Sequence, residues 1–225
     1  MAIGTTKTAD ALGLPTTVDL VTNSVQSFNG AAKVTWNVNA SNNDPTLKIV
    51  QTFTVSGTVT LPNGVENPDN VPLETSVIVT VNKIPQSQMA ATATSQETIS
   101  ENSAASMAID GNPQTVWHTK WDKSDVLPQS IILHLGGTYP VDKVAYLPRL
   151  SGNNGIITSY NVYVSTDGET FTKVTSGTWA NDNAQKLSTF DPTDASYIKL
   201  EATVGVNGWA SAAEISVLQT ETANK

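Results

Sequence analysis

The sequence predicts an all-β protein built from two consecutive β-sandwiches. Short segments in which apolar and polar side chains alternate recur along the chain, and clusters of Gly, Pro and Asn separate them. Val and Thr, which favour strands, are abundant, whereas charged residues make up only 14% of the 225 residues. Strands that recur about every 8 to 12 residues are typical of sandwiches. Long helices are not expected.

The first sandwich is expected to occupy residues 1–83. Four runs with a period of two predict its strands, because alternate side chains of a strand face opposite sides of a sheet. The turn Pro62–Gly64 closes the third run. Trp36 shares its period with Val34 and Val38, so we interpret it as a core residue. The runs are 17–22, 33–38, 53–61 and 77–81.

The second sandwich is expected over residues 84–220, with 221–225 as a tail. It holds all five Tyr, both His, the only Arg and four of the five Trp, so most of the side chains suited to binding lie here. Asp167-Gly168 predicts a tight hairpin turn. The segment 84–88 is either a linker or the start of this domain. Its alternating runs include 131–135, 160–164, 197–200 and 215–217.

Composition excludes several classes of partner. The net charge is −8, and nucleic acids or anionic membranes would need clustered Lys and Arg. The chain has no Cys, which excludes disulfides and thiolate metal sites. No window approaches the length of a membrane span, so membrane insertion is not expected. The start of the chain lacks an export signal and is interpreted as an expression start in front of a fragment.

The stretch 108–122 concentrates oxygen-bearing and aromatic side chains. Asp110, Asn112 and Thr115 lie on a turn that Gly and Pro make tight, and such a turn can wrap a hard cation such as calcium. A His and a Trp three residues apart follow at once. The first half is therefore interpreted as a structural ion site and the second half as the edge of a sugar-binding site.

Two resemblances add to this interpretation. Residues 10–83 resemble the bacterial immunoglobulin-like repeats of large surface enzymes, through 14–18 (LPTTV), 34–36 (VTW) and 53–59 (FTVSGTV). The second segment resembles a discoidin (coagulation factor 5/8 type C) domain and, within that family, the carbohydrate-binding modules of family 32. Its motifs are 106–119 (SMAIDGNPQTVWHT), 128–136 (PQSIILHLG), 159–168 (SYNVYVSTDG) and 212–215 (AAEI). The predicted fold is thus an immunoglobulin-like sandwich followed by a discoidin-type jelly roll.

The discoidin resemblance implies a structural calcium ion that ties the first motif to the last strand. Its ligands would be oxygen atoms from five positions, one of them a main-chain carbonyl at Ala213. Sodium in the same site and an ordinary Asp-Gly turn are the alternatives. The implied ligands are Asp110, Asn112, Thr115, Ala213 and Glu214.

The same resemblance implies a sugar site made of a His, an Arg, an Asn and two aromatic residues. A sugar has an apolar face, which an aromatic ring can cover, and hydroxyls at its edge, which fixed donors and acceptors can bind. Loop length leaves Asn153 as an alternative to Asn154. The implied residues are His118, Trp121, Arg149, Asn154 and Trp209. Trp117 and Trp179 are expected to pack in the core, and His134 is expected to be a satisfied or surface-facing side chain rather than a ligand.

The leading functional hypothesis is a non-catalytic module that recognises terminal galactose-type sugars: galactose, lactose, N-acetyllactosamine or N-acetylgalactosamine. It would be a monomer, secreted or at the surface of a bacterium, excised from a glycoside hydrolase that it holds on glycans. One alternative is attachment to phospholipid or to a cell surface. A glycosidase is another, but it needs two facing carboxylates, and Asp122 and Asp125 lie in one loop without an evident partner.

Overall fold

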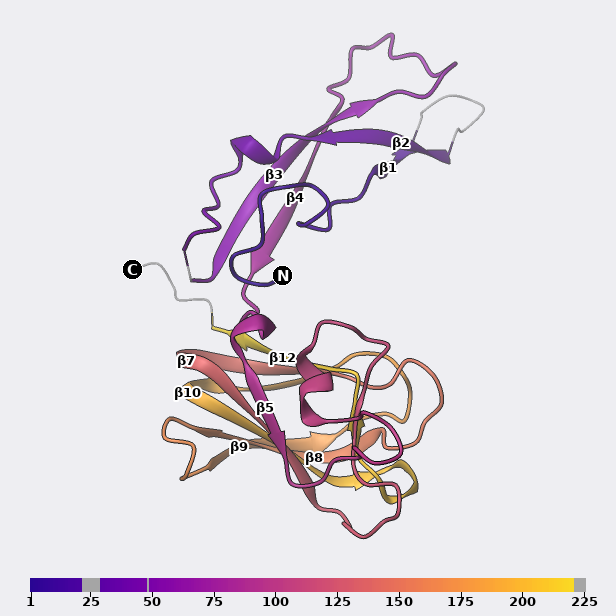
Figure 1. The fold of residues 1–225 in the computed structure, drawn as a ribbon. Coiled ribbons are helices and arrows are strands. Elements are labelled where there is room, and N and C mark those ends of the chain that lie inside the picture. Colours follow the sequence, from indigo (N-terminus) through magenta and orange to yellow (C-terminus); the bar gives the residue numbers. More distant parts are fainter. Residues whose placement is uncertain (22–28, 48, 221–225) are drawn as a thin grey trace. The chain divides into compact units, whose positions relative to one another are not determined.

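The computed structural model describes residues 1–21, 29–47 and 49–220, and it divides into two compact units (Figure 1). They are Met1–Asn82 and Lys83–Lys225. The expected end of the first strand at Thr22 and the expected tail 221–225 lie outside the described residues. Within them the helices are short 3-10 turns, and none is long and apolar enough to cross a membrane.

The first unit contains an antiparallel sheet whose four strands follow the order of the chain. Val34 pairs with Val59, and Phe53 pairs with Val79, so apolar side chains gather on one face. The elements are β1 (Thr17–Val21), β2 (Asn29–Trp36), η1 (Val38–Ala40), β3 (Gln51–Thr60) and β4 (Glu74–Val81).

The first unit differs from the expected two-sheet sandwich. In its described part, the apolar face of the sheet is covered by the segment before β1, whose Leu12 and Leu14 pack with Phe53 and Val55. The opposite face is exposed and carries polar side chains such as Thr54. A period of two shows that one face of a sheet is buried, but it does not show what covers that face.

The second unit contains a six-stranded sheet and a two-stranded sheet. The large sheet has the order β12-β7-β10-β8-β9, with β5 paired to β7, and the small one pairs β6 with β11. The strands are β5 (Ala90–Ala93), β6 (Trp117–His118), β7 (Gln129–Leu147), β8 (Ile157–Ser165), β9 (Thr172–Thr178), β10 (Lys186–Gly205), β11 (Ser211–Ala212) and β12 (Glu214–Gln219). The 3-10 turns are η2 (Gln86–Gln88), η3 (Ala105–Ile109) and η4 (Val206–Gly208).

The two longest strands, β7 and β10, pair with each other along most of their length within the large sheet. Their pairing shifts register between Thr189 and Thr193 and between Ala195 and Tyr197. On one side of these shifts β7 pairs with β12, and on the other side it pairs with β5. Such irregularities bend strands, so the sheet can fold around a core as in a jelly roll.

The core of the second unit confirms the predicted packing residues. Trp117 has no exposed surface, and its indole N–H donates to the carbonyl of Ser95 at 3.0 Å. Trp179 stacks on Tyr146 and on Tyr160, with ring centroids 4.9 and 3.7 Å away. His134 is exposed.

The segment 84–88 belongs to the second unit. Ile84 is only 1% exposed and lies in that unit's core cluster. Gln86 donates from Nε2 to Glu214 and to the carbonyl of Ile215.

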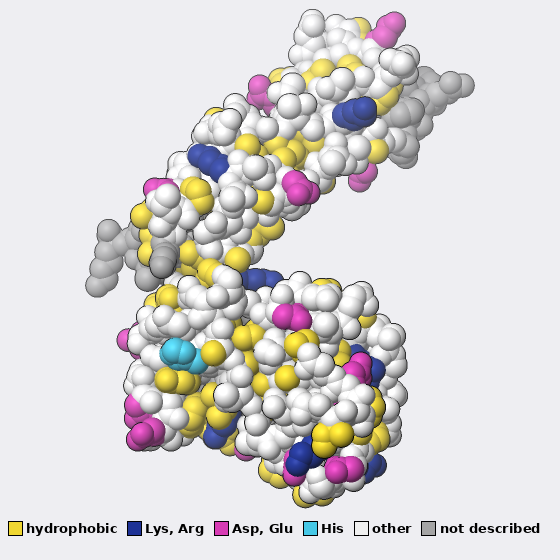
Figure 2. Space-filling model, in the orientation of Figure 1, with side chains coloured by type: hydrophobic (Ala, Val, Ile, Leu, Met, Phe, Trp, Pro, Cys, Tyr) yellow, Lys and Arg dark blue, Asp and Glu magenta, His cyan; other side chains and the backbone are white. Residues whose placement is uncertain are grey.

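Charged side chains on the face drawn in Figure 2 are few and scattered, in agreement with the low charged fraction of the sequence.

Candidate functional site

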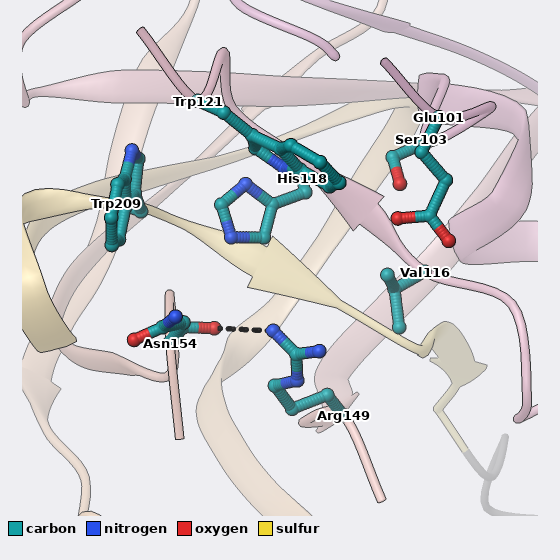
Figure 3. Close-up of a pocket in the computed structure, with 8 residues that line it drawn as sticks. All are labelled: Glu101, Ser103, Val116, His118, Trp121, Arg149, Asn154 and Trp209. Carbon is teal, nitrogen blue, oxygen red and sulfur yellow. Dashed lines mark hydrogen bonds between the residues drawn. The ribbon is translucent and has the colours of Figure 1, made fainter. Parts of the chain in front are cut away.

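A cavity of about 410 Å³ lies in the second unit, and all five residues predicted to bind sugar line it (Figure 3). They come from separate segments, since His118 ends β6, Arg149 follows β7 and Trp209 follows η4. Pairing of His118 with Ser211 holds two of these segments together. The lining consists of Glu101, Ser103, Val116, His118, Trp121, Arg149, Asn154 and Trp209.

His118 presents one fixed ring nitrogen to a ligand. The side chain is 4% exposed, and its Nδ1 lies 2.6 Å from the carbonyl oxygen of Thr119. Because a carbonyl oxygen only accepts, Nδ1 carries the proton and Nε2 is left as an acceptor. Burial lowers the pKa of His118, and the charge of Arg149 lowers it further against the opposing hydrogen bond to Thr119. The ring is therefore neutral at pH 7.

Two tryptophans form aromatic walls beside His118 (Figure 3). The ring of Trp121 is perpendicular to the imidazole, with centroids 6.2 Å apart, and the ring of Trp209 is tilted to it at 5.8 Å. Trp121 is 42% exposed, which is unusual for a large apolar side chain and leaves its surface free to cover a ligand. Lys123 Nζ lies 4.4 Å from the centroid of the Trp209 ring.

Arg149 and Asn154 supply hydrogen-bond donors. Arg149 Nε donates to the carbonyl of Ser151 at 2.8 Å, and Nη1 donates to the carbonyl of Asn154 at 3.3 Å. These bonds orient the guanidinium and leave other N–H groups for a ligand. Asn207 donates to Asn154 Oδ1 at 2.5 Å, so the Nδ2 of Asn154 is the donor that remains. Asn154, and not the alternative Asn153, lines the cavity.

The loop that carries Arg149 and Asn154 is held in shape from outside the cavity. Asn183 Nδ2 donates to the carbonyls of Arg149 and Gly152, at 2.7 and 2.8 Å. Gly155 has a φ of 78°, and a Cβ there would lie 2.9 Å from Ser211 Oγ, so a larger residue would be strained and crowded. The loop geometry thus depends on residues that the cavity itself does not display.

Three lining residues, Glu101, Ser103 and Val116, were not predicted. Figure 3 shows Glu101 and Ser103 on the side of the cavity opposite Trp209. Glu101 lies in a polar stretch with no aromatic neighbour or repeated pattern, so its sequence context does not distinguish it from a surface acid. It adds a carboxylate, which can accept hydrogen bonds from hydroxyl groups.

The residues predicted to hold an ion lie in two groups. On the turn, Thr115 Oγ1 donates to Asp110 Oδ2 at 2.7 Å, and the backbone N–H of Asn112 donates to Asp110 Oδ1 at 2.8 Å. Ala213 and Glu214 are distant in sequence and lie where β12 begins, but the Glu214 carboxylate is close enough to Asp110 to interact with it. No group of three acidic, His or Cys side chains gathers among the described residues, so any ion here would depend partly on neutral oxygens.

The surroundings of Glu214 fit a cation. Its Oε2 accepts from Gln86 at 2.5 Å, but Oε1 is buried without a hydrogen-bond partner among the described atoms. Burial raises the pKa of Glu214, and the Asp110 carboxylate raises it further against the hydrogen bond from Gln86. Two neighbouring carboxylates and an unpaired buried oxygen are destabilising unless a positive charge compensates them.

Comparison with known proteins assigns the second unit to a family. Residues 90–215 match the F5/8 type C domain. CpGH89CBM32-5 from Clostridium perfringens, solved with GalNAc-β-1,3-galactose, is 46% identical, with a TM-score of 0.59 over 60% of this chain and 99% of that chain. The family 32 CBM from C. perfringens NanJ, solved with galactose, is 49% identical, with a TM-score of 0.57 over 60% of this chain and 97% of that chain.

Two longer enzymes share the similarity. The A type blood N-acetyl-α-D-galactosamine deacetylase of Flavonifractor plautii is 40% identical over 135 residues, which are 60% of this chain and 18% of that protein. The sialidase of Micromonospora viridifaciens is 37% identical over 149 residues, which are 64% of this chain and 23% of that protein. The chain thus spans less than a quarter of the length of either enzyme.

Proposed function

The chain belongs to the F5/8 type C domain family through residues 90–215, and on this basis we propose that its second unit is a carbohydrate-binding module for terminal galactose-type sugars. One observation carries the proposal: five residues from three separate segments line a single cavity, in which two tryptophans supply aromatic surface, His118 supplies an acceptor nitrogen, and Arg149 and Asn154 supply donors. The structure of CpGH89CBM32-5 was determined with GalNAc-β-1,3-galactose, and that of the NanJ module was determined with galactose.

The polarity of the cavity favours a sugar with an axial hydroxyl. Nε2 of His118 can accept one hydroxyl proton, while the guanidinium of Arg149 and the amide N–H of Asn154 can donate to oxygens. An axial hydroxyl, as at position 4 of galactose, leaves the plane of the ring and can reach both an acceptor and a donor while the apolar face of the sugar lies on a tryptophan. The equatorial hydroxyl of glucose points elsewhere.

The proposed ligands are galactose, lactose, N-acetyllactosamine and N-acetylgalactosamine. An open site of this size is expected to bind one sugar with a Kd of about 1 mM, which is about −4.1 kcal/mol. Presentation of many sugars on one surface would raise the effective strength. The module would therefore act by holding an attached protein near glycans rather than by retaining free sugar.

We further propose that a calcium ion occupies the site formed by the Asp110 turn and Glu214, with sodium as the alternative. The unpaired Oε1 of Glu214 and its proximity to Asp110 support this. The ion would neutralise the two carboxylates and tie the turn after η3 to the start of β12. The proposed ligand set is Asp110, Asn112, Thr115, the carbonyl of Ala213 and Glu214.

The proposed setting is a secreted or cell-surface bacterial glycoside hydrolase, in which this chain is a non-catalytic part. Similarity to a module of a C. perfringens protein and to segments of two longer enzymes supports this setting. The first unit would be an immunoglobulin-like spacer. Its four antiparallel strands are compatible with that role, and the assignment rests on the sequence motifs of the first segment.

Calorimetry of the whole chain with galactose, lactose, N-acetyllactosamine and glucose tests the proposal. The first three should bind and glucose should not. Trp121→Ala should abolish measurable binding because it removes an aromatic wall, while Trp36→Phe in the first unit should bind as the wild type does. A wild-type chain that bound none of the galactosides would refute the specificity, and a Trp121→Ala variant with wild-type affinity would refute the location.

A further inference from the structure

Glu97 lies outside the cavity, and its carboxylate accepts three backbone hydrogen bonds. The N–H groups of Ile99 and Ser100 donate to Oε1, both at 2.8 Å, and the N–H of Trp121 donates to Oε2 at 3.1 Å. The residue is 5% exposed. Because these bonds favour the charged form, they lower the pKa of Glu97, with Ser100 contributing most, then Trp121 and Ile99.

The backbone of Glu97 joins the same two segments. Its N–H donates to the carbonyl of His118 at 2.8 Å, and its carbonyl accepts from the N–H of Ser103 at 2.9 Å. The N–H of His118 also donates to the carbonyl of Ser103, at 3.2 Å. One side of the cavity is therefore a small network centred on Glu97, which bonds directly to three lining residues: Ser103, His118 and Trp121.

We propose that Glu97 is a positioning residue of the sugar site. Its carboxylate fastens the turn that carries Glu101 and Ser103 to the segment that carries His118 and Trp121, and so sets the distance between these two sides of the cavity. The inference rests on the proposed sugar-binding function, and it adds a residue that touches no sugar. Trp121 needs such a support because its side chain is 42% exposed and core packing holds little of it.

The chemistry of a carboxylate suits this task better than that of an amide. Glutamate offers two acceptor oxygens and no donor, which matches three N–H groups arriving from two segments. Glutamine has the same shape, but it must place an NH₂ donor against one of the two sets of N–H groups. Glu97→Gln should therefore keep its amide oxygen on the two N–H groups of Ile99 and Ser100 and lose the bond from Trp121.

The test compares Glu97→Gln with a matched variant at a distant turn. Asp167 accepts from the N–H groups of Glu169 and Thr170, both at 2.9 Å, at the end of β8 opposite to the end that meets the sugar loop. Asp167→Asn thus removes a similar carboxylate from a backbone turn without touching the cavity. Both variants should unfold at lower urea concentration than the wild type.

Only Glu97→Gln should weaken the binding of galactose, by about tenfold, the effect of losing a charge-assisted hydrogen bond. The affinity is read from the rise in unfolding midpoint with galactose concentration, which reports on the folded fraction even of an unstable variant. Glu97→Asp keeps the charge but shortens the side chain, and it should weaken binding as well. Wild-type affinity in Glu97→Gln, or an equal loss in Asp167→Asn, would overturn the proposal.

Hydrogen exchange separates this inference from the proposed function. The amide of Trp121 should exchange faster in Glu97→Gln than in the wild type and in Asp167→Asn, whether or not galactose is the ligand. If the wild type bound no galactoside, the proposed function would fail while this result could still support the role of Glu97. Unchanged exchange at Trp121 would refute that role directly.

Discussion

The two units are built from the same kind of alternating strand, but they differ in which strands pair. In the first unit β1, β2, β3 and β4 pair in the order of the chain. In the second unit β7 pairs with β5, β10 and β12, which are distant from one another in the sequence. Local pairing builds a sheet, whereas this non-local pairing also brings loops from remote segments to one place.

That difference explains where the candidate site lies. The cavity draws on the segment around Glu101, the β6 segment, the loop after β7 and the turn after η4. Each of these would be an ordinary surface loop alone, and they meet because β6 pairs with β11 and β7 pairs with strands that are distant in sequence. The position of the candidate site in this molecule therefore depends on topology more than on strand composition.

The two units should differ most in their response to loss of the largest side chain of the second core. Trp117→Ala should lower the free energy of unfolding of the second unit by about 3 to 5 kcal/mol, because it leaves a large buried cavity. Urea unfolding followed by NMR signals from each unit should show the first unit unchanged. A matching shift in the first unit would show that the two units unfold together.

Removal of the proposed calcium ion should also destabilise the second unit and not the first, but by less than Trp117→Ala does. A chelator should lower the stability of the second unit, by about 2.7 kcal/mol if free calcium had been about 100 times its Kd. The first unit should not respond. Glu214→Gln should make the second unit insensitive to the chelator, since it removes a proposed charged ligand. A wild-type unfolding midpoint that does not change with the chelator would contradict calcium as the bound ion.

Substitution of the single arginine should weaken sugar binding without unfolding either unit. Arg149→Lys cannot reproduce the bonds to Ser151 and Asn154 while still facing a ligand, and we expect a loss of about 1.4 kcal/mol, or about tenfold in Kd. Calorimetry with galactose measures it. Lys33→Arg on the exposed face of the first unit is the control and should bind normally.

The smallest expected effect is a pH dependence of binding. Burial places the pKa of His118 below its ordinary value of 6.5. Galactose affinity should be constant above that value and should fall as pH drops through the lowered pKa, because protonation removes the Nε2 acceptor. His134→Ala, which alters an exposed histidine, should keep the same profile. A profile that is flat through acid pH would exclude Nε2 as the acceptor.

The free energy of unfolding should also fall as pH falls, because of the lowered pKa of His118. The unfolded chain binds a proton more readily than the folded chain, so the folded state loses stability as pH falls below the unfolded pKa of about 6.5. The loss continues down to the lowered folded pKa. Urea midpoints of the second unit measured across this range should show that trend, and the first unit, which has no histidine, should not show it.

Several features could be predicted because they depend on local order. Alternation located the strands that bury Phe53, Leu133 and Val162, since a period of two defines the faces of a sheet wherever the strand lies. The family motifs identified the five residues that line the cavity. The order of the strands in the first unit, and the segment that covers its sheet, could not be inferred, because alternation does not specify partners.

The support for the site was also hidden from the sequence. The sequence around Glu97, Asn183 and Asn207 is typical of polar surface positions, and Glu101 has no distinguishing neighbours. Their roles arise from hydrogen bonds to segments that are distant in sequence, such as the bond from Trp121 to Glu97 and the bonds from Asn183 to Arg149 and Gly152. No local pattern encodes such a bond, since its partner is set by the path of the chain.

Alternation and composition indicate that the chain is all-β and where most strands lie, and the discoidin resemblance implies which side chains could bind sugar. The fold class and the strands follow from periodicity, which is local, and the candidate binding residues follow from short sequence motifs. The tertiary structure alone decided that Asn154 and not Asn153 faces the cavity, that Glu101 joins it and that Glu97 holds its edge. Those outcomes depend on where distant backbone segments meet, and only the folded chain sets those distances.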